Sequence, residues 1–451
     1  MKTHARFNYK EDTAMTYPEL AKLNLWGAIH KMAETPWEFA KNPDADFTRN
    51  RKLDFENLLR FLIAKESDNT ANELLKYFGH GTDTISNSAF YQQRKKLLPE
   101  TFPFLLHSFN SHYPFELYKG VYNLVGTDGC DLNIFRNPND KDTFHQSNGK
   151  SERGFNSLLA VASFDILGKR YLDCIIQPGR LKNEFRAICD LIDRYSYEGI
   201  PIFIGDRGYS SYNLFAHAKE NGILFMVRAK DVNVMRLLGI DALPDSADEH
   251  VDIILSRSQA KSKMKHPDLA DQYRYVSPEV SFDYTQPGSG DEYPLSLRIV
   301  RFEVADGEFQ NVITNLPADK FSADEIKGLY KLRWNIETSF RDLKHTIGAT
   351  DFISKKAVYI EQEIWARLVL FNFCAIIAAH VVIARNDTKH VYQVNFAMAM
   401  KICHHFIRLR EHDPPPDVER LIGRYTLPIR LGRNFPRLHR FQTPFSFCYR
   451  H

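Results

Sequence analysis

The chain has 451 residues, of which 43% are hydrophobic and 25% are charged, and its formal net charge at pH 7 is +3. This balance is typical of a folded protein, and an aromatic content of 13% excludes long disordered stretches. The length exceeds that of a single hydrophobic core, so we expect two to four domains or one core with large insertions.

The six cysteines form no C-x-x-C pair and no metal-finger spacing, which suits a reducing interior better than a secreted disulfide scaffold. The start of the chain has no apolar segment of the kind found in secretory signals. The longest apolar run, residues 368–384, is interrupted by Asn372 and His380, and we interpret it as a buried helix instead of a membrane span. The expected location is the cytoplasm.

The charges are unevenly distributed. Residues 401–451 contain ten Lys and Arg against four Asp and Glu, whereas residues 231–320 contain nine against sixteen. The basic C-terminal region can face an anionic partner or be a solvated tail, and charge alone leaves both interpretations open.

The first hundred residues or so predict helices. Phe55, Leu58, Leu59, Leu62 and Ile63 follow the i, i+3, i+4, i+7, i+8 spacing and share one helical face.

Two shorter helices are expected next. Thr70 and Glu73 resemble a capping box. Ser86 or Ser88 can cap a third helix, whose polar and basic residues 92–96 are typical of a DNA-reading helix. An ordinary exposed helix fits this segment equally well.

Strand and helix patterns alternate after residue 121. The expected order is three strands, helix, strand, helix and strand, which predicts a mixed sheet with helices on its faces. The expected segments are strands Tyr122–Thr127, Leu158–Phe164 and Tyr171–Ile176, helix Asn183–Tyr195, strand Ile202–Ile204, helix Tyr212–Asn221 and strand Ile223–Val227.

The acidic segment 231–320 interrupts this order and predicts a β-rich insertion, with candidate strands Tyr273–Val276, Leu295–Val304 and Gln310–Thr314. Helices are expected again at Ala323–Ile347 and Ala357–Arg385. The predicted domains are a helical N-terminal DNA-binding region (1–117), a core in two parts (118–230 and 321–385) around the insertion (231–320), and a basic C-terminal region (386–451).

Two carboxylates are expected at strand ends. Asp128 follows the first predicted strand, and Asp206 follows the fourth. If these strands are neighbours, both acids lie at the edge of the sheet where ligands of α/β proteins bind. Two close carboxylates repel each other unless a cation bridges them, and Mg²⁺ prefers such oxygen ligands. Either residue alone is more often a turn former.

A third acid lies on a predicted helix. Tyr330, Glu337 and Lys344 are seven residues apart and form one stripe, with Arg333 beside them. The stripe combines a possible metal ligand with groups that bind phosphates. The alternative is an exposed helix with an ordinary Arg333–Glu337 pair.

These motifs occur together in one order. The stripe matches Y-x2-R-x3-E-x6-K, and the segment 205–212 reads Gly-Asp-Arg-Gly-Tyr-Ser-Ser-Tyr. With Asp128 in Asp-Gly-Cys-Asp-Leu upstream, the chain resembles the DDE transposases of the insertion-sequence family four. The resemblance covers most of the chain and implies an α/β fold with a ribonuclease-H-like core.

The resemblance implies that Asp128, Asp206 and Glu337 are the catalytic, metal-binding triad. It also implies that the residues that contact DNA are Tyr330, Arg333, Lys344 and Arg207. Aromatic candidates for base stacking are Tyr273, Tyr275, Phe282 and Tyr284, whereas Trp334 is expected in the core.

The implied activity is metal-dependent excision and strand transfer of an insertion sequence, with two divalent ions (Mg²⁺ or Mn²⁺) as cofactors. The implied partners are double-stranded DNA, as transposon ends and target, and a second copy of the chain in a synaptic dimer. Such a protein is cytoplasmic and is associated with the nucleoid when it is bound to DNA. The alternatives are a ribonuclease-H-like metal-dependent nuclease, a domesticated DNA-binding protein, and an α/β protein whose acids coincide by chance.

Overall fold

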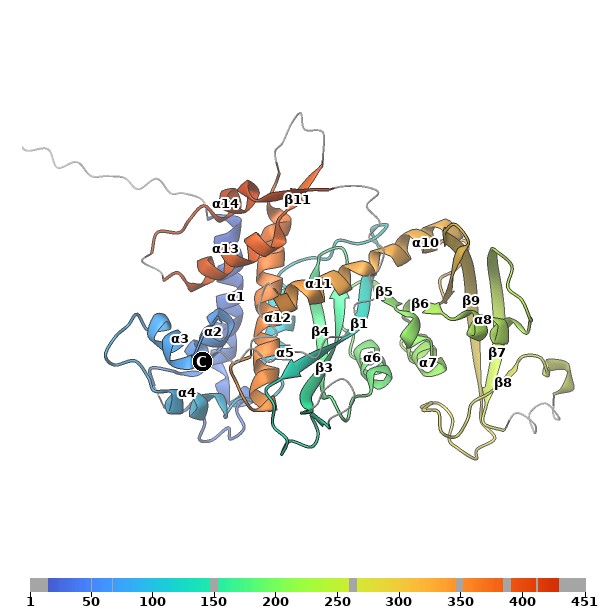
Figure 1. Ribbon diagram of the computed structural model, residues 1–451, viewed down its shortest axis with the longest axis horizontal. Helices are drawn as coiled ribbons and strands as arrows, with labels where there is room; N and C mark the ends of the chain where they lie inside the picture. Colours follow the sequence, from blue (N-terminus) through green and yellow to red (C-terminus); the bar gives the residue numbers. More distant parts are fainter. Residues whose placement is uncertain are drawn as a thin grey trace, which may run out of the picture. The chain divides into compact units, whose positions relative to one another are not determined.

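The structure is a computed structural model, and Figure 1 shows the chain. It describes residues 15–49, 51–66, 68–146, 153–258, 266–345, 352–383, 391–410 and 413–429. The described chain forms two compact units. One contains the residues up to His112 together with those from Val369 onward, and the other contains Tyr113–Leu368. The last part of the predicted basic region, 430–451, lies outside the described residues.

The unit of Tyr113–Leu368 is built on one sheet, in which ten strands are described. Their spatial order is β2-β3-β1-β5-β6-β10-β9-β7-β8, with β4 paired to β3. The strands are β1 (Tyr122–Ile134), β2 (Phe144–His145), β3 (Phe155–Asp165), β4 (Arg170–Pro178), β5 (Ile200–Gly205), β6 (Leu224–Ala229), β7 (Ala247–Ser256), β8 (Tyr273–Tyr275), β9 (Glu292–Ala305) and β10 (Glu308–Thr314).

The pairing around β1 confirms the predicted fold class. β1 pairs antiparallel with β3, which pairs antiparallel with β4. On its other side β1 runs parallel to β5, and β5 runs parallel to β6. A three-stranded meander followed by parallel strands that are joined through helices is the ribonuclease-H-like order expected from the sequence.

The predicted β-rich insertion extends this sheet. β10 pairs antiparallel with β6, and β9, β7 and β8 continue outward from β10. Figure 1 shows these strands at the opposite end of the sheet from β3 and β4. The insertion therefore shares backbone hydrogen bonds with the core through one strand, β10.

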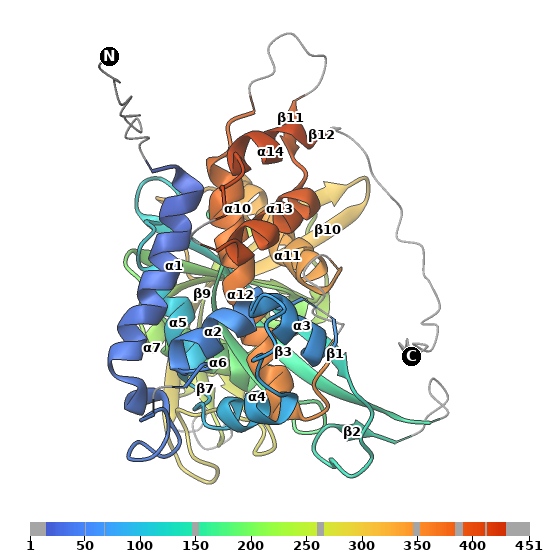
Figure 2. The same cartoon turned by 90° about the vertical axis from the view of Figure 1, so that its left-hand side faces the viewer.

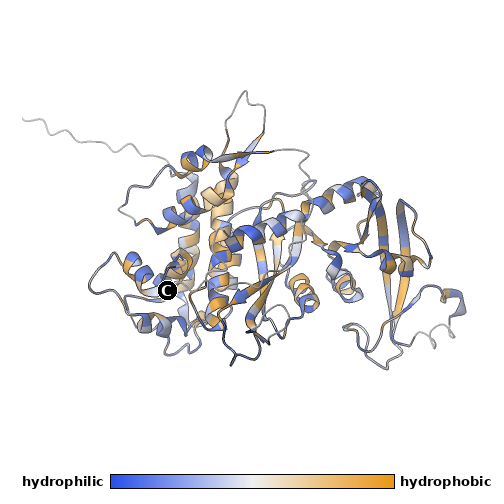
Figure 3. Ribbon diagram, in the orientation of Figure 1, coloured by the Kyte–Doolittle hydropathy of each residue, from blue (hydrophilic) through white to orange (hydrophobic). Residues whose placement is uncertain are grey.

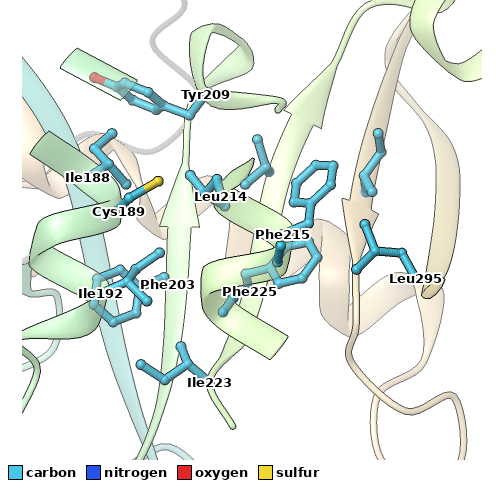
Figure 4. Close-up of a cluster of buried hydrophobic side chains, with 14 of the residues drawn as sticks. Ile188, Cys189, Ile192, Phe203, Tyr209, Leu214, Phe215, Ile223, Phe225 and Leu295 are labelled. Atoms are coloured by element: carbon cyan, nitrogen blue, oxygen red, sulfur yellow. The ribbon is translucent and has the colours of Figure 1, made fainter. Parts of the chain in front are cut away.

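Helices cover both faces of the sheet. The helices of this unit are α6 (Glu184–Asp193), α7 (Tyr212–Glu220), α8 (Asp231–Leu238), α10 (Ala323–Leu332), α11 (Trp334–His345) and the first part of α12 (Ala357–His380). Successive strand residues point to opposite faces. Val125 therefore packs in one apolar cluster with α6 and α7, and Leu124 packs in a second cluster with α10. In the first cluster the rings of Phe215 and Phe225 stack at 4.7 Å (Figure 4).

The other unit is mainly helical. α1 packs against α2 and α5, and α13 contacts α14 and α2 (Figure 2). Its elements are α1 (Tyr17–Glu34), α2 (Phe55–Ala64), α3 (Thr70–Tyr77), α4 (Asn87–Arg94), α5 (Thr101–Asn110), the rest of α12, α13 (Phe396–Arg408), α14 (Val418–Arg424), and the paired strands β11 (Tyr392–Val394) and β12 (Thr426–Pro428). The apolar face predicted from Phe55 onward is the buried face of α2.

Two predictions about the shorter helices are wrong. The side chain of Asn69 caps α3 by accepting a hydrogen bond from the Asn72 amide, so Thr70 is inside the helix. Gln93 and Arg94 of α4 are buried, with Arg94 fully covered. A side chain that packs into its own domain cannot read a base, so α4 does not present these two residues to DNA.

Helix α12 contains most of the apolar run that we interpreted as a buried helix. It is long and apolar enough to cross a membrane by composition alone, and Figure 3 shows its apolar colouring. However, 83% of its most apolar 18-residue window is buried inside the protein. This burial supports the interpretation of α12 as a core helix.

Candidate active site

Asp128 lies inside β1, not after it as we predicted. The strand continues to Ile134 because β3 pairs with β1 from Val125 onward, and Asp128 is opposite Ala162. The parallel pairing with β5 ends earlier, at Gly126 and Ile204. Asp128 is therefore two residues beyond the point where β1 and β5 separate.

Asp206 directly follows β5 and precedes a single 3-10 turn, Arg207–Tyr209. Because β1 and β5 are parallel neighbours, Asp128 and Asp206 lie at the same edge of the sheet. The condition under which we placed both acids at one edge, that the first and fourth predicted strands are neighbours, is met. Arg207 is exposed beside Asp206.

Glu337 lies on α11, whose buried face packs against β1. The helix lies directly over Gly126 of β1: a Cβ added there would be in ordinary contact, at 3.5 Å, with the Cβ of Ile336, which is fully buried. The predicted single helix 323–347 is divided into α10 and α11 at Arg333. Tyr330 is consequently on α10, whereas Glu337 and Lys344 are on α11.

Arg333 is the most constrained cation of the site. It donates a hydrogen bond from Nη2 to Glu337 Oε1 at 2.6 Å, and its side chain is only 7% exposed. Its Nε and Nη1 are buried and have no hydrogen-bond partner among the described residues. Buried guanidinium groups without acceptors are costly. Two donor nitrogens of Arg333 are thus left unsatisfied by the described residues.

The other predicted phosphate contacts lie on the same two helices. Tyr330 donates from its hydroxyl to Asp206 Oδ1 at 3.4 Å, and burial raises the pKa of Tyr330 to about 12. Lys344 donates from Nζ to the carbonyl oxygen of Asp131, in β1, at 3.0 Å. Tyr330 and Lys344 therefore lie against the sheet edge that carries the acids.

Burial governs the charge of Asp128. It raises the pKa of this carboxyl to about 6, while the Gly129 amide and Arg333 act in the opposite direction and Glu337 raises it further. The Gly129 amide donates to Asp128 Oδ1 at 2.9 Å. Glu337 therefore lies within electrostatic range of Asp128.

The donor set can be tested for its fit to divalent metal ions. Within the described ranges, no three His, Cys, Asp or Glu side chains are gathered closely enough to hold a metal ion together. The chemistry of the donors nevertheless fits a hard cation, because Asp128, Asp206 and Glu337 offer carboxylate oxygens. The raised pKa of Asp128 identifies a buried carboxyl whose charge Arg333 offsets only in part. A cation would favour its charged form.

The structure also revises the aromatic candidates. Trp334 is 53% exposed, so the prediction that it packs into the core is wrong. Tyr273 and Phe282 are buried, whereas Tyr275 is 52% exposed. Of these rings, only Trp334 and Tyr275 present a large accessible face.

Two residues at the site were not assigned a role from the sequence. The Tyr209 hydroxyl lies 3.3 Å from Asp128 Oδ1 and 2.5 Å from Glu184 Oε1, and its one proton is shared between these acceptors. The only sequence signal for Tyr209 is its place in the segment that begins with Gly205 and Asp206. Glu184, on α6, lies in no motif that we considered.

Comparisons with known proteins agree with this arrangement. Residues 123–373 match the family described as "Transposase DDE domain", so the chain belongs to this family. The chain is also 33% identical over 89 residues to the transposase InsG for insertion sequence element IS4 of Escherichia coli (strain K12). The predicted resemblance to insertion-sequence family four is therefore confirmed.

The extent of these matches differs. The alignment with InsG covers 19% of this chain and 20% of the relative, so the chain matches about a fifth of the length of that relative. Among solved structures, the chain is similar to a piggyBac transposase in a synaptic complex with hairpin DNA. That match has 11% identity and a TM-score of 0.44, and it covers 90% of this chain and 84% of the other.

Proposed function

We propose that the chain is a DNA transposase that excises and joins an insertion sequence, with Asp128, Asp206 and Glu337 as its catalytic acids. The observation that carries this proposal is the position of the acids relative to the edge at which β1 and β5 separate. Two of the acids lie at this edge, and α11 packs the third against β1. Membership of the DDE-domain transposase family supports the same assignment.

The three acids would hold the divalent ions, Mg²⁺ or Mn²⁺. When bound, these ions activate a water or a DNA 3′-hydroxyl and stabilise the leaving oxygen of the phosphate. The protein needs no nucleophile of its own for this chemistry. Asp128 must be ionised to serve as a ligand, and the Gly129 amide holds its Oδ1 in one direction.

The cations of the site would bind the DNA backbone. The unpartnered Nε and Nη1 of Arg333 are buried next to Glu337, and because they point to different sides of the guanidinium they would donate to separate oxygens of the DNA backbone. The guanidinium lies over the ring of Tyr330, whose hydroxyl donates to Asp206 Oδ1, and exposed Arg207 extends the positive charge outward. Lys344 would contact a phosphate further along α11.

The proposed partners are double-stranded DNA, as transposon ends and as target, and a second copy of the chain in a synaptic dimer. The proposed location is the cytoplasm, with association to the nucleoid during DNA binding. The support for DNA as the partner is the family membership and the site chemistry described above.

The proposal is tested with the full chain and a labelled duplex that carries the inverted repeats flanking the gene. We expect cutting at the repeat boundary in Mg²⁺ or Mn²⁺ and none with EDTA. Asp206→Asn should abolish cutting and leave binding to the same duplex within about 2-fold, because the loss of one carboxylate leaves the phosphate contacts intact. The matched control is Asp245→Asn, which changes an exposed aspartate outside the site.

Three results would contradict the proposal in different ways. Full activity of Asp206→Asn would remove this residue from the catalytic site. Cutting that ignores the repeats and joins no strands would identify a general nuclease. Binding without cutting by the unaltered chain, in either metal, would identify a DNA-binding protein that has lost the activity.

A further inference from the structure

Tyr209 connects Asp128 to a fourth carboxylate, that of Glu184. The Tyr209 hydroxyl is 2.5 Å from Glu184 Oε1 and 3.3 Å from Asp128 Oδ1, so its single proton is shared between these two acceptors. Asp128 is in β1, Tyr209 ends the turn after Asp206, and Glu184 is the first residue of α6. Three separate elements thus meet at one hydroxyl group.

Tyr209 is held rigidly at this place. Its ring is 4% exposed and packs in the apolar cluster between α6 and α7, where Figure 4 shows the hydroxyl directed away from the apolar side chains. Its amide donates to the Asp206 carbonyl oxygen at 3.0 Å, which closes the turn after β5. The ring therefore cannot move without disturbing the core and the Asp206 backbone.

Glu184 is positioned by the start of its helix. The Asn183 side chain caps α6 by accepting from the Arg186 amide at 3.0 Å. The Asn183 backbone is joined to the Gln177 side chain at the end of β4 by bonds of 2.7 and 3.3 Å. These contacts fix the first turn of α6, and with it Glu184, against the meander.

Gly129 shows how closely Glu184 approaches β1. A Cβ added to Gly129 would lie 1.9 Å from Glu184 Oε1 and 2.8 Å from its carboxyl carbon. Any side chain at position 129 would therefore displace the glutamate. The absence of a side chain next to Asp128 is what allows Glu184 to reach Tyr209.

The hydrogen-bond inventory indicates the direction of the contact. A tyrosine hydroxyl has one proton, and an ionised carboxylate only accepts. Glu184 Oε1 is the nearer acceptor of this proton and Asp128 Oδ1 the more distant one. Tyr209 and the Gly129 amide both reach the same oxygen of Asp128, Oδ1, and together they restrict the rotation of this carboxylate.

We propose that Tyr209, itself held by Glu184, is a positioning residue that orients the Asp128 carboxylate for binding a divalent ion. The proposal rests on the proposed role of Asp128 as a metal ligand. Glu184 acts as a hydrogen-bond acceptor for Tyr209, and its own oxygens are not ligands. Partners of metal ligands in other proteins change metal affinity by about 10- to 100-fold when they are removed.

The test is a titration of the full chain with Mn²⁺, followed by the electron paramagnetic resonance signal of the free ion. Tyr209→Phe should weaken Mn²⁺ binding about 10-fold. Glu184→Ala should weaken it to a similar extent, whereas Glu184→Gln keeps an acceptor for Tyr209 and should stay within about 3-fold of the unaltered chain. The double variant Tyr209→Phe/Glu184→Ala should bind no more weakly than Tyr209→Phe alone, because the two residues act in series.

The matched control for the lost hydroxyl is Tyr197→Phe. Tyr197 donates to the Leu172 carbonyl oxygen, in β4, at 2.9 Å and packs against the same cluster. It should leave Mn²⁺ binding unchanged. Thermal unfolding of each variant identifies a folding defect, and Glu184→Ala keeps the Tyr209 ring in the core should Tyr209→Phe fail to fold.

The possible outcomes distinguish a failure of the positioning role from a failure of the proposed function. Unchanged Mn²⁺ binding in Tyr209→Phe would overturn the positioning role. Equal, large losses in Glu184→Gln and Glu184→Ala would also overturn it, because they would make Glu184 a ligand. An unaltered chain that binds Mn²⁺, shows the expected variant pattern and cuts no DNA would contradict the proposed function and keep the positioning role. An unaltered chain that binds no Mn²⁺ would overturn both.

Discussion

Arg333 and Glu337 form a one-sided pair: a single hydrogen bond of 2.6 Å joins them, and the two remaining nitrogens of the guanidinium are buried without a partner in the described chain. An ordinary surface pair one helical turn apart leaves both groups in water. Here the arginine is 7% exposed and the glutamate 27%. The site thus retains two buried donors that the protein itself does not satisfy.

Because Arg333 has two unsatisfied donor nitrogens, we can predict the effect of Arg333→Lys. Lysine keeps the positive charge but replaces the planar guanidinium, whose Nε and Nη1 point to different sides, with a single ammonium group. We expect cutting of the end duplex to fall by about 100-fold, as for other lost donors to a reacting group. Binding of the same duplex should change much less. Cleavage rates at saturating DNA provide the measurement, and a rate within 3-fold of the unaltered chain would contradict a specific role of the guanidinium.

Asp128 predicts an unusual pH dependence of stability. Its pKa is raised from the ordinary 3.8 to about 6, so the folded state keeps a proton that the unfolded chain releases. The stability from this group is fully present below pH 3.8 and is lost as the pH rises through about 6. Asp128→Asn should therefore stabilise the metal-free protein by about 1–3 kcal/mol at pH 7.5 and have little effect near pH 4.

Urea unfolding of Asp128→Asn at both pH values checks this prediction, with Asp245→Asn as the control. The control changes an exposed aspartate and should be neutral at both pH values. If Asp128→Asn destabilised the protein at pH 7.5, the carboxylate would not be the unfavourable buried charge described above.

Ile336 is expected to link stability and activity. Its fully buried side chain faces the Gly126 backbone of β1 and is adjacent in sequence to Glu337. Ile336→Ala should cost about 2–4 kcal/mol by leaving a cavity. It should also slow DNA cutting, because the support for Glu337 is weakened. Ile200→Ala makes the same change at a position that is 42% exposed. Chemical unfolding and cleavage assays on both variants check this prediction. Equal losses of stability and of cleavage rate in Ile336→Ala and Ile200→Ala would contradict it.

Much of the fold could be predicted because its signals are local. The spacing of Phe55 to Ile63 predicts α2, and the short apolar run at Ile202–Ile204 identifies the central part of β5. Asp206 was placed correctly because β5 does end before it. The neighbouring position of β1 and β5 was only a condition of the interpretation, because local sequence does not determine which strands pair.

The errors arise where distant contacts override local preference. Gly126 to Gly129 has the composition of a turn, yet pairing with β3 continues β1 through Asp128 to Ile134. Arg333 is a good helix former, so nothing in its local sequence predicts the break between α10 and α11. Trp334 was expected in the core from its size, but at this break it points outward. Glu184 and Tyr209 are far apart along the chain, and only the folded sheet brings them together.

The central claim is that Glu337 completes a catalytic site with the two aspartates, and the most direct test compares the unaltered chain with Glu337→Gln. Both are mixed with the end duplex in Mn²⁺, and cutting at the repeat boundary and joining to a target plasmid are measured. Glu308→Gln, an exposed glutamate outside the site, is the control. The account predicts that Glu337→Gln folds and binds the duplex but loses cutting and joining by at least about 100-fold. Cutting and joining at the rate of the unaltered chain would contradict it.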